Sequence, residues 1–287
     1  MFLLRLLSRL PFWFLYLLSD FLFFLIYHVI HYRREMVQKN LRNAFPQFDA
    51  EHVKRIEREF YHNMADYAVE MLKLLTISEK EFRNRLKLVN TDLMDRIKGS
   101  HESFFGLTSH QFNWEWALAG TILQAPLPLD FVYQPVKIEL FERFSLASRT
   151  RFGGHAIKRD EVARELFKRR ANPKIIGLAA DQYPGMDRDK RYATTFLNQE
   201  TVFFDGTNQL AVLMQYPVLF FNTRKVKRGY YEVTIELLTE PPYAKGDTQV
   251  VEKYARKLER AILENPANWL WSHDRWKTRH LKTESAS

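Results

Sequence analysis

The sequence predicts an α/β fold in which an N-terminal membrane helix and a helical segment precede a mixed sheet with flanking helices. Three observations carry this prediction: a long apolar run near the N-terminus, helical periodicity after it, and short apolar segments that alternate with helical ones beyond. We expect a membrane anchor at 1–31, a basic juxtamembrane and helical segment at 32–95, an α/β domain at 96–280 and a disordered tail at 281–287.

The apolar run covers residues 10–27 and contains one charged residue, Asp20, and one proline, Pro11. At about 1.5 Å per helical residue it is roughly 27 Å long, which is close to the thickness of the hydrocarbon layer. The run continues without a small-residue cleavage site, unlike a secretory signal peptide. We therefore expect an attached membrane helix, and its length allows it either to span the bilayer or to lie in the interface.

The basic residues that follow the apolar run predict that the larger part of the chain lies on the cytoplasmic side. Arg33, Arg34, Lys39 and Arg42 follow the apolar run, and basic flanks favour the cytoplasmic face and anionic headgroups. The 43 Lys and Arg residues against 34 Asp and Glu residues give a net charge of +9, which suits a membrane surface or nucleic acid. Basic and acidic residues interleave along most of the predicted helices, a pattern that disfavours nucleic-acid binding.

The cysteine count narrows the chemistry. With no cysteine in 287 residues, disulfides, thiolate zinc sites, iron–sulfur clusters and cysteine nucleophiles are excluded. We expect neither a metal ion nor a cofactor, so the chemistry has to come from other side chains.

Apolar residues recur at three- and four-residue steps over 48–75, which predicts a helix or helical pair with Asp49 as its N-cap. Beyond it, five short apolar segments are strand candidates with helical patterns around them. The expected strands are 103–109, 128–134, 174–180, 217–223 and 230–238, and the expected helices are 112–124, 137–150, 160–170, 206–215 and 247–264. A Lys-Arg-Gly turn joins the last two strands, and the alternation of strands with helices indicates a sheet with parallel members.

Three histidines are followed five residues later by an acid, although the composition predicts about one such pair by chance. The pairs are His52–Glu57, His155–Asp160 and His110–Glu115. The first lies in a charged helix, where five residues turn through about 140° and separate the side chains, so we interpret it as solvated surface. In the second, Asp160 is more simply the N-cap of the following helix.

His110 differs because it stands directly after an apolar strand and before an apolar helix. Ligands collect at the carboxyl ends of strands in open α/β sheets. Glu115, in the first helical turns, is placed to accept a hydrogen bond from one ring nitrogen and so fix the tautomer, while the other nitrogen takes a proton from a hydroxyl. No G-x-S-x-G motif accompanies the pair, so that hydroxyl can belong to the substrate. The alternative is a structural histidine at a strand end.

Five motifs follow the apolar run in order. They are NLRNAFP at 40–46, SHQFNWEW at 109–116, VYQP at 132–135 leading to FERFSLASRTRFGG at 141–154, ADQYPG at 180–185, and NPANWLWSHDRWK at 265–277. Together with the N-terminal helix, this order resembles the late acyltransferases of lipid A biosynthesis, within the broader glycerophosphate acyltransferase-like group. The match covers nearly the whole chain. Taken alone, the tryptophans of the last motif suit an interfacial belt or a core patch.

The resemblance implies a glycerophosphate acyltransferase-like fold and an O-acyltransferase of the bacterial inner membrane. The expected reaction passes a fatty acyl chain from a thioester, on acyl carrier protein or CoA, directly to a hydroxyl of a lipid A precursor. His110 is the expected general base and Glu115 its orienting partner. Arg149 is expected to bind phosphate or developing charge, because a guanidinium binds phosphate bidentately and stays charged. The other expected substrate-binding residues are Asp181, Asn113, Gln182 and Arg151.

Two positions depart from the family pattern: Phe112, where the family often has glycine, and Gln134, where it often has a basic residue. Phe112 is expected to narrow the acceptor site and Gln134 to remove a phosphate contact. The acceptor therefore stays open between a lipid A precursor and another membrane lipid, such as an amino-acid lipid or a glycolipid. A further alternative is a non-enzymatic, membrane-anchored protein that binds anionic lipid through its net charge of +9.

Overall fold

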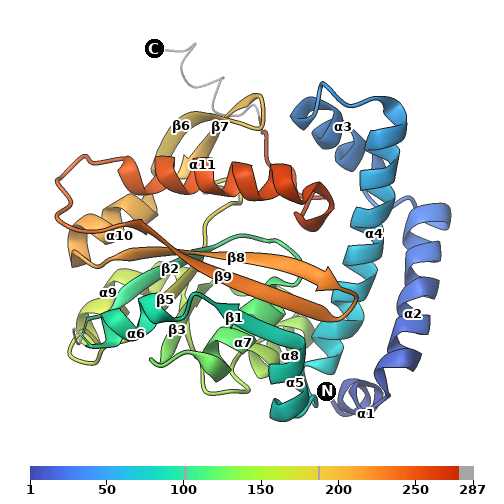
Figure 1. Cartoon of the computed structure of the whole chain (residues 1–287), viewed down its shortest axis with the longest axis horizontal. Coiled ribbons are helices and arrows are strands. Elements are labelled where there is room, and N and C mark those ends of the chain that lie inside the picture. The colour runs from blue at the N-terminus through green and yellow to red at the C-terminus, as the bar shows by residue number, and fades with distance from the viewer. Residues whose placement is uncertain (100–101, 187, 278–287) are drawn as a thin grey trace.

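A computed structural model describes residues 1–99, 102–186 and 188–277, so the tail predicted at 281–287 lies outside the described residues. A seven-stranded mixed sheet runs through the molecule in the order β1-β9-β8-β2-β5-β3-β4. Helices cover both faces of the sheet, and β6 and β7 form a separate hairpin (Figure 1). The predicted α/β class with an N-terminal apolar helix is confirmed.

The elements have the following bounds. The strands are β1 (Leu86–Val89), β2 (Phe104–Thr108), β3 (Leu129–Tyr133), β4 (His155–Lys158), β5 (Ile175–Ala179), β6 (Arg191–Phe196), β7 (Gln199–Phe204), β8 (Val218–Lys227) and β9 (Tyr230–Thr239). The α-helices are α1 (Phe2–Ser8), α2 (Phe12–Phe24), α3 (Arg34–Ala44), α4 (Ala50–Lys73), α5 (Glu79–Arg85), α6 (Asp92–Gly99), α7 (Trp114–Gln124), α8 (Glu139–Arg149), α9 (Val162–Lys168), α10 (Gly206–Met214) and α11 (Gln249–Glu264). A π-helical turn, η1 (Leu25–Val29), continues α2, and two 3₁₀ turns are η2 (Arg159–Glu161) and η3 (Pro266–Asn268).

All five predicted strands are present, and β1, β4, β6 and β7 were not predicted. The first two are four-residue strands at the two edges of the sheet, and the β6–β7 hairpin is largely polar, so none of them forms an apolar run. β1 precedes residue 96 and pairs with β9. The sheet therefore includes a strand from the segment that the sequence assigned to the preceding helical region.

The centre of the sheet separates two apolar layers. Successive residues of β2 point to opposite faces, so Phe105 and Leu107 join the core beneath α11 while Phe104 joins the core beneath α7. β2 pairs in parallel with β5 on one side and with β8 on the other. The carboxyl ends of these three strands therefore lie at one edge of the sheet, which is the edge that α4 passes (Figure 1).

The long helix α4 begins at its predicted N-cap, because the Asp49 side chain accepts a hydrogen bond of 2.8 Å from the backbone N–H of His52. α2 lies beside α4 in the antiparallel direction (Figure 1). Residues Phe12–Val29 form a helix long and apolar enough to cross a membrane, with a mean hydropathy of 1.7, and 22% of it is buried against the rest of the protein.

Two interpretations of the histidine–acid pairs are wrong in detail. Glu57 is buried and accepts a hydrogen bond of 2.6 Å from Arg34 of α3, because the long α3–α4 contact covers that face of α4. Asp160 does not cap α9, whose N-cap is Glu161, and instead pairs with Arg188 at 2.6 Å.

Candidate active site

Strand register brings His110 beside Asp181. Thr108 ends β2 and Ala179 ends β5, and these two residues are partners in the parallel pairing of the strands. His110 and Asp181 each lie two residues beyond that pair, so the register delivers them to the same place at the carboxyl edge of the sheet. The prediction that His110 stands at a strand end, before a helix, is therefore confirmed.

The Asp181 carboxylate holds both the ring and the backbone of His110. One oxygen, Oδ1, lies 2.7 Å from His110 Nδ1, and the other, Oδ2, accepts from the backbone N–H of His110 at 3.0 Å and from Trp269 Nε1 at 2.8 Å. Burial by itself raises the pKa of Asp181, but the charge of His110 and these hydrogen bonds outweigh it and lower the pKa to about 2. An ionised Asp181 fixes the proton on Nδ1 and leaves Nε2 of His110 as the basic nitrogen.

Glu115 does not orient His110, which corrects the predicted dyad. Its carboxylate instead holds Arg149 in a bidentate ion pair, with Nε donating to Oε2 at 2.8 Å and Nη2 donating to Oε1 at 2.5 Å. Trp114 Nε1 also donates to Glu115 Oε1 at 3.1 Å. Glu115 stands in the first turn of α7, and its side chain turns toward the end of α8 because Arg149 is the cation that α8 presents there.

His110, Glu115 and Arg149 line one cavity with a volume of about 590 Å³, whereas Asp181 is buried next to His110 and is not a lining residue. The polar end of the cavity contains His110, Glu115, Arg149 and His273, and Gln182 lies exposed at this end. The cavity then extends between the sheet and α7. The apolar lining of this extension includes Gly106, Ala117, Leu118, Leu129, Phe131, Ile175, Gly177, Phe221 and Val233. A cavity with a base at one end and an apolar extension suits a ligand that has a reactive polar group attached to a hydrocarbon.

Two glycines leave room for the apolar extension. Gly106 of β2 and Gly177 of β5 are partners in the parallel pairing and lie on the face toward α7. A Cβ atom on Gly106 would lie 2.9 Å from Cε2 of Phe221, and one on Gly177 would lie 3.5 Å from Cδ2 of Leu129. Side chains at these two positions would therefore fill part of the cavity floor.

Three other residues predicted to act on substrate have structural contacts. Asn113 is fully buried, caps α7 by accepting from the backbone N–H of Trp116 at 3.1 Å, and donates to Glu70 at 2.9 Å. Arg151 donates to the backbone carbonyls of Leu74 and Ile77 and does not line the cavity. Phe112 packs in the core and is not a cavity-lining residue, so it does not narrow the acceptor site as predicted.

Gln134 lines the cavity. It lies next to Val136, which lines the cavity and is 46% exposed, and three more exposed apolar residues follow. These are Ile138, Leu140 and Phe141. The cavity therefore opens beside an apolar part of the surface.

The C-terminal motif supplies contacts that the sequence did not reveal. Trp269 and Trp271 are buried, so the core patch rather than the interfacial belt is the correct interpretation of these tryptophans. Trp269 pairs with Gln111 in an isolated β-bridge and binds Asp181, so this segment supports the turn that contains His110. His273 lines the cavity, and burial lowers its pKa to about 4, which keeps it neutral at pH 7.

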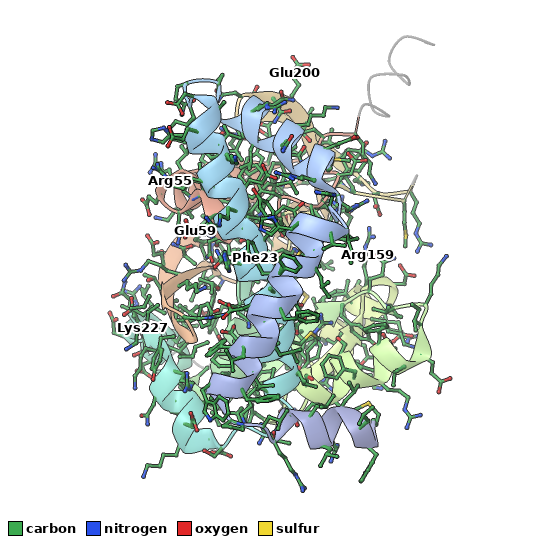
Figure 2. All side chains as sticks on the ribbon, turned by 90° about the vertical axis from the view of Figure 1, so that its right-hand side faces the viewer. Phe23, Arg55, Glu59, Arg159, Glu200 and Lys227 are labelled. Atoms are coloured by element: carbon green, nitrogen blue, oxygen red, sulfur yellow. The ribbon has the colours of Figure 1, made fainter. Side chains whose placement is uncertain are left out.

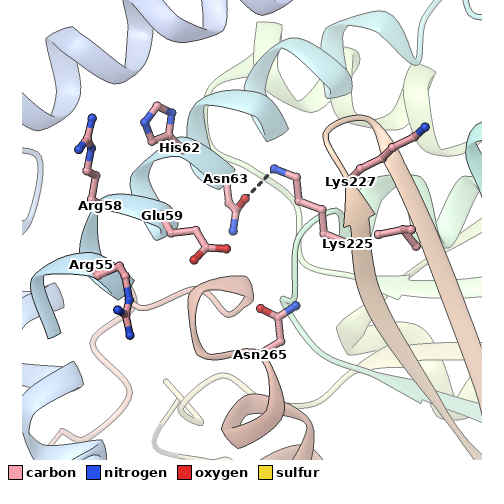
Figure 3. A pocket seen from close by; sticks show the side chains of 9 residues that line it. Arg55, Arg58, Glu59, His62, Asn63, Lys225, Lys227 and Asn265 are labelled. Carbon is pink, nitrogen blue, oxygen red and sulfur yellow. Dashed lines mark hydrogen bonds between the residues drawn. The ribbon is translucent and has the colours of Figure 1, made fainter. Parts of the chain in front are cut away.

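A second hollow of about 460 Å³, the hairpin cleft, lies between α4 and the β8–β9 hairpin. It is lined by Arg55, Arg58, Glu59, His62, Asn63, Lys225, Val226, Lys227 and Asn265. Lys225 donates to Asn63 at 2.8 Å across it (Figure 3). Within the described ranges, no group of three or more His, Asp or Glu residues is placed to hold a metal ion.

Known proteins resemble this chain over most of its length. The family model described as bacterial lipid A biosynthesis acyltransferase matches residues 1–278. The chain is similar to a lipid A biosynthesis palmitoleoyltransferase of Escherichia coli K12, with 23% identity over 88% of this chain and 81% of the relative. It is equally similar, with the same identity and coverage, to a lipid A biosynthesis acyltransferase of Shigella flexneri. The chain therefore belongs to the bacterial lipid A biosynthesis acyltransferase family and is an acyltransferase.

Proposed function

We propose that this protein transfers a fatty acyl chain from a thioester donor to a hydroxyl of a lipid A precursor, with His110 as the general base. The observation that carries the proposal is the His110–Asp181 pair, joined at 2.7 Å, at the polar end of a cavity that is otherwise largely apolar. The apolar part between the sheet and α7 is the proposed site of the acyl chain. Membership of the lipid A acyltransferase family supports the acceptor class.

In the proposed mechanism, Nε2 of His110 takes the proton of the acceptor hydroxyl as its oxygen attacks the thioester carbonyl. The tetrahedral intermediate then collapses, the carbon–sulfur bond breaks, and the imidazolium returns its proton to the departing thiolate. Asp181 stabilises the imidazolium through Nδ1 without accepting the proton, because its pKa lies near 2. In this proposal the acyl group passes directly between the two substrates, and the absence of cysteine excludes an enzyme thioester.

Arg149 is the proposed binder of negative charge. Glu115 occupies Nε and Nη2 of its guanidinium, and Nη1 makes no hydrogen bond with the described residues. Because Arg149 lines the cavity, Nη1 is the donor available to an acceptor phosphate or to the oxyanion of the intermediate. Glu115 is thus a positioning residue for Arg149 in this proposal.

The donor is proposed to be acyl carrier protein, and the catalytic part is proposed to face the cytoplasm. The net charge of +9 supports an acidic carrier protein, because opposite charge steers association. The basic residues after η1 support the cytoplasmic placement. A competition between acyl carrier protein and acyl-CoA as donors, in purified protein, separates the two donor classes.

The test of the function is acyl transfer by purified full-length protein, with mass analysis of the acylated lipid. We expect His110→Ala to lower turnover by about 10³-fold or more while lipid binding persists. His155→Ala, on the edge strand β4, is the matched control and should keep wild-type turnover. Wild-type transfer by His110→Ala would refute the base assignment, and acylation of a different membrane lipid would refute the acceptor.

A further inference from the structure

The N-terminal helices present a row of large apolar side chains to the outside. Phe2 and Leu6 of α1 are 83% and 52% exposed, and Trp13, Leu17 and Phe24 of α2 are 66%, 59% and 52% exposed. Figure 2 views the molecule with α2 toward the reader, and this helix forms the ridge of that face. An exposed apolar row of this kind marks a contact surface.

The opposite face of α2 buries Leu15 and Phe23, and it also makes polar contacts with α4 and the β8–β9 turn. Ser19 donates to Asp66 at 2.7 Å. Asp20, near the middle of the apolar run, accepts from Arg228 of the β8–β9 turn at 2.6 Å. Both members of this ion pair are partly exposed, with side-chain exposures of 48% for Asp20 and 37% for Arg228. Charged groups therefore stand level with the middle of α2.

Contacts with α4 extend along the whole apolar run. At one end, Lys73 of α4 donates to the backbone carbonyl of Leu10 at 2.8 Å. Toward the other end, the rings of Phe23 and His62 stack with their centroids 3.5 Å apart. No part of α2 extends beyond the body of the protein, so any membrane that surrounded α2 would also surround α4 and the hairpin.

Charged residues of neighbouring elements lie on both sides of α2, at heights along its axis that fall within the apolar run. Figure 2 shows Arg55, Glu59 and Lys227 on one side of the helix and the cavity-lining residue Arg159 on the other. Charged and polar residues make up most of the lining of the hairpin cleft, and the Glu59 carboxylate is directed into it (Figure 3). If α2 crossed the bilayer, these groups would enter the hydrocarbon layer, where charged side chains are disfavoured.

We infer that α1 and α2 lie along the surface of one membrane leaflet, with the exposed apolar row in the acyl region, and do not cross the bilayer. The partner is a leaflet that contains anionic phospholipid, because Arg5 and Arg9 are exposed beside the apolar row and favour anionic headgroups. The inference concerns membrane contact and stands independently of the chemistry at His110. It also places α4 close to the leaflet, and Tyr67 of this helix packs against the cavity residue Trp114.

The absence of cysteine makes the full-length chain suited to single-cysteine labelling. Arg9→Cys and Tyr32→Cys bracket α2, and Lys253→Cys on α11 reports the body of the protein. A membrane-impermeant maleimide is applied to sealed inside-out and right-side-out bacterial membrane vesicles. We expect all three cysteines to be labelled from the same side. Labelling of Arg9→Cys only from the side opposite to Lys253→Cys would overturn the inference.

A depth measurement covers the case in which lipid shields a cysteine from the maleimide. Fluorophores on Trp13→Cys, Leu17→Cys and Phe24→Cys are quenched by nitroxide lipids in vesicles of phosphatidylethanolamine and phosphatidylglycerol. We expect similar, shallow depths at the three positions and no quenching for the control Lys227→Cys. A deep Leu17→Cys between shallow neighbours would show a crossing helix. Absence of quenching together with cross-linking between copies would assign the row to a dimer, and either outcome refutes the inference.

Discussion

Asp181 and Glu115 are two buried carboxylates beside the same cavity. The one closer to His110 in sequence is not the one that binds its imidazole. Glu115, five residues from His110, holds a guanidinium, whereas Asp181, seventy-one residues away, holds the imidazole. Both side chains are almost fully buried, at 1% and 2% exposure. The difference lies in backbone direction: strand register aims Asp181 at His110, while the helix aims Glu115 at α8. In an α/β protein, the partner of a strand-end residue is best sought at the end of the neighbouring strand.

The different roles of the two carboxylates are tested most directly by replacing each with its amide. We expect Asp181→Asn to lower kcat by about 10³- to 10⁴-fold, because an amide at this position no longer fixes the reactive tautomer of His110. Steady-state acyl transfer measures the change, and circular dichroism checks that the variant folds. If Glu115→Gln lost as much kcat and Asp181→Asn kept most of it, the assignment of the two roles would be reversed.

Glu115→Gln should mainly weaken binding of the acceptor. We expect its KM for a phosphorylated acceptor to rise by about 10-fold, with a smaller fall in kcat, because Arg149 loses the carboxylate that positions it. The loss of one member of a buried ion pair should also lower the free energy of unfolding by about 2 kcal/mol. Kinetics with acceptors that carry and lack phosphate measure the first effect, and urea unfolding measures the second. An unchanged KM for both acceptors would contradict the proposed role of Arg149.

As the pH falls, His273 should lower the stability of the protein first and Asp181 second. Burial lowers the pKa of His273 from 6.5 to about 4, so the unfolded chain binds more protons and stability falls as the pH drops from about 6.5 to about 4. The pKa of Asp181 is lowered from 3.8 to about 2, so its contribution is present above about pH 4 and is lost between about pH 4 and pH 2. Unfolding midpoints between pH 8 and pH 3 should therefore fall in two stages. His273→Gln should flatten the first stage and leave the second, and an unchanged first stage would show that another group titrates there.

The smallest expected effect concerns the cavity floor. Gly106→Ala places a Cβ atom 2.9 Å from Phe221, so the floor narrows, whereas Gly177→Ala makes an ordinary contact at 3.5 Å with Leu129. We expect Gly106→Ala to shift kcat/KM toward shorter acyl donors by about 3- to 10-fold, and Gly177→Ala to do so less. A series of acyl carrier proteins with different chain lengths measures the shift. Equal chain-length selectivity in the wild type and in both variants would place the acyl chain outside this cavity.

The sequence predicted the central architecture because that architecture depends on local pattern. Apolar segments marked β2, β5 and β8, and periodicity with the cap at Asp49 marked α4. The edge strand β1 lacks such a pattern, since pairing with β9 rather than its own composition makes it a strand. His110 was predicted from its place after β2, but the pairing that selects Asp181 as its partner depends on the order of strands in the sheet, which no local pattern specifies.

The motifs predicted where residues lie along the chain better than they predicted what the side chains of those residues contact. Asn113 binds a backbone N–H and a buried carboxylate, and Arg151 binds backbone carbonyls away from the cavity lining. Polar residues of a motif often support the turn that presents the reactive group, and spacing does not distinguish that task from substrate contact.

The Glu70 carboxylate has a practical consequence for work with shortened forms of this protein. It accepts hydrogen bonds from Asn113 beside the turn that contains His110, from Tyr231 of the sheet and from Tyr16 of the N-terminal helix. Deleting the first thirty residues to gain solubility would remove Tyr16 and expose to water a buried carboxylate that contacts Asn113. A loss of activity in such a truncated protein would then report damage to the active site, and it would say nothing about whether the enzyme needs a membrane.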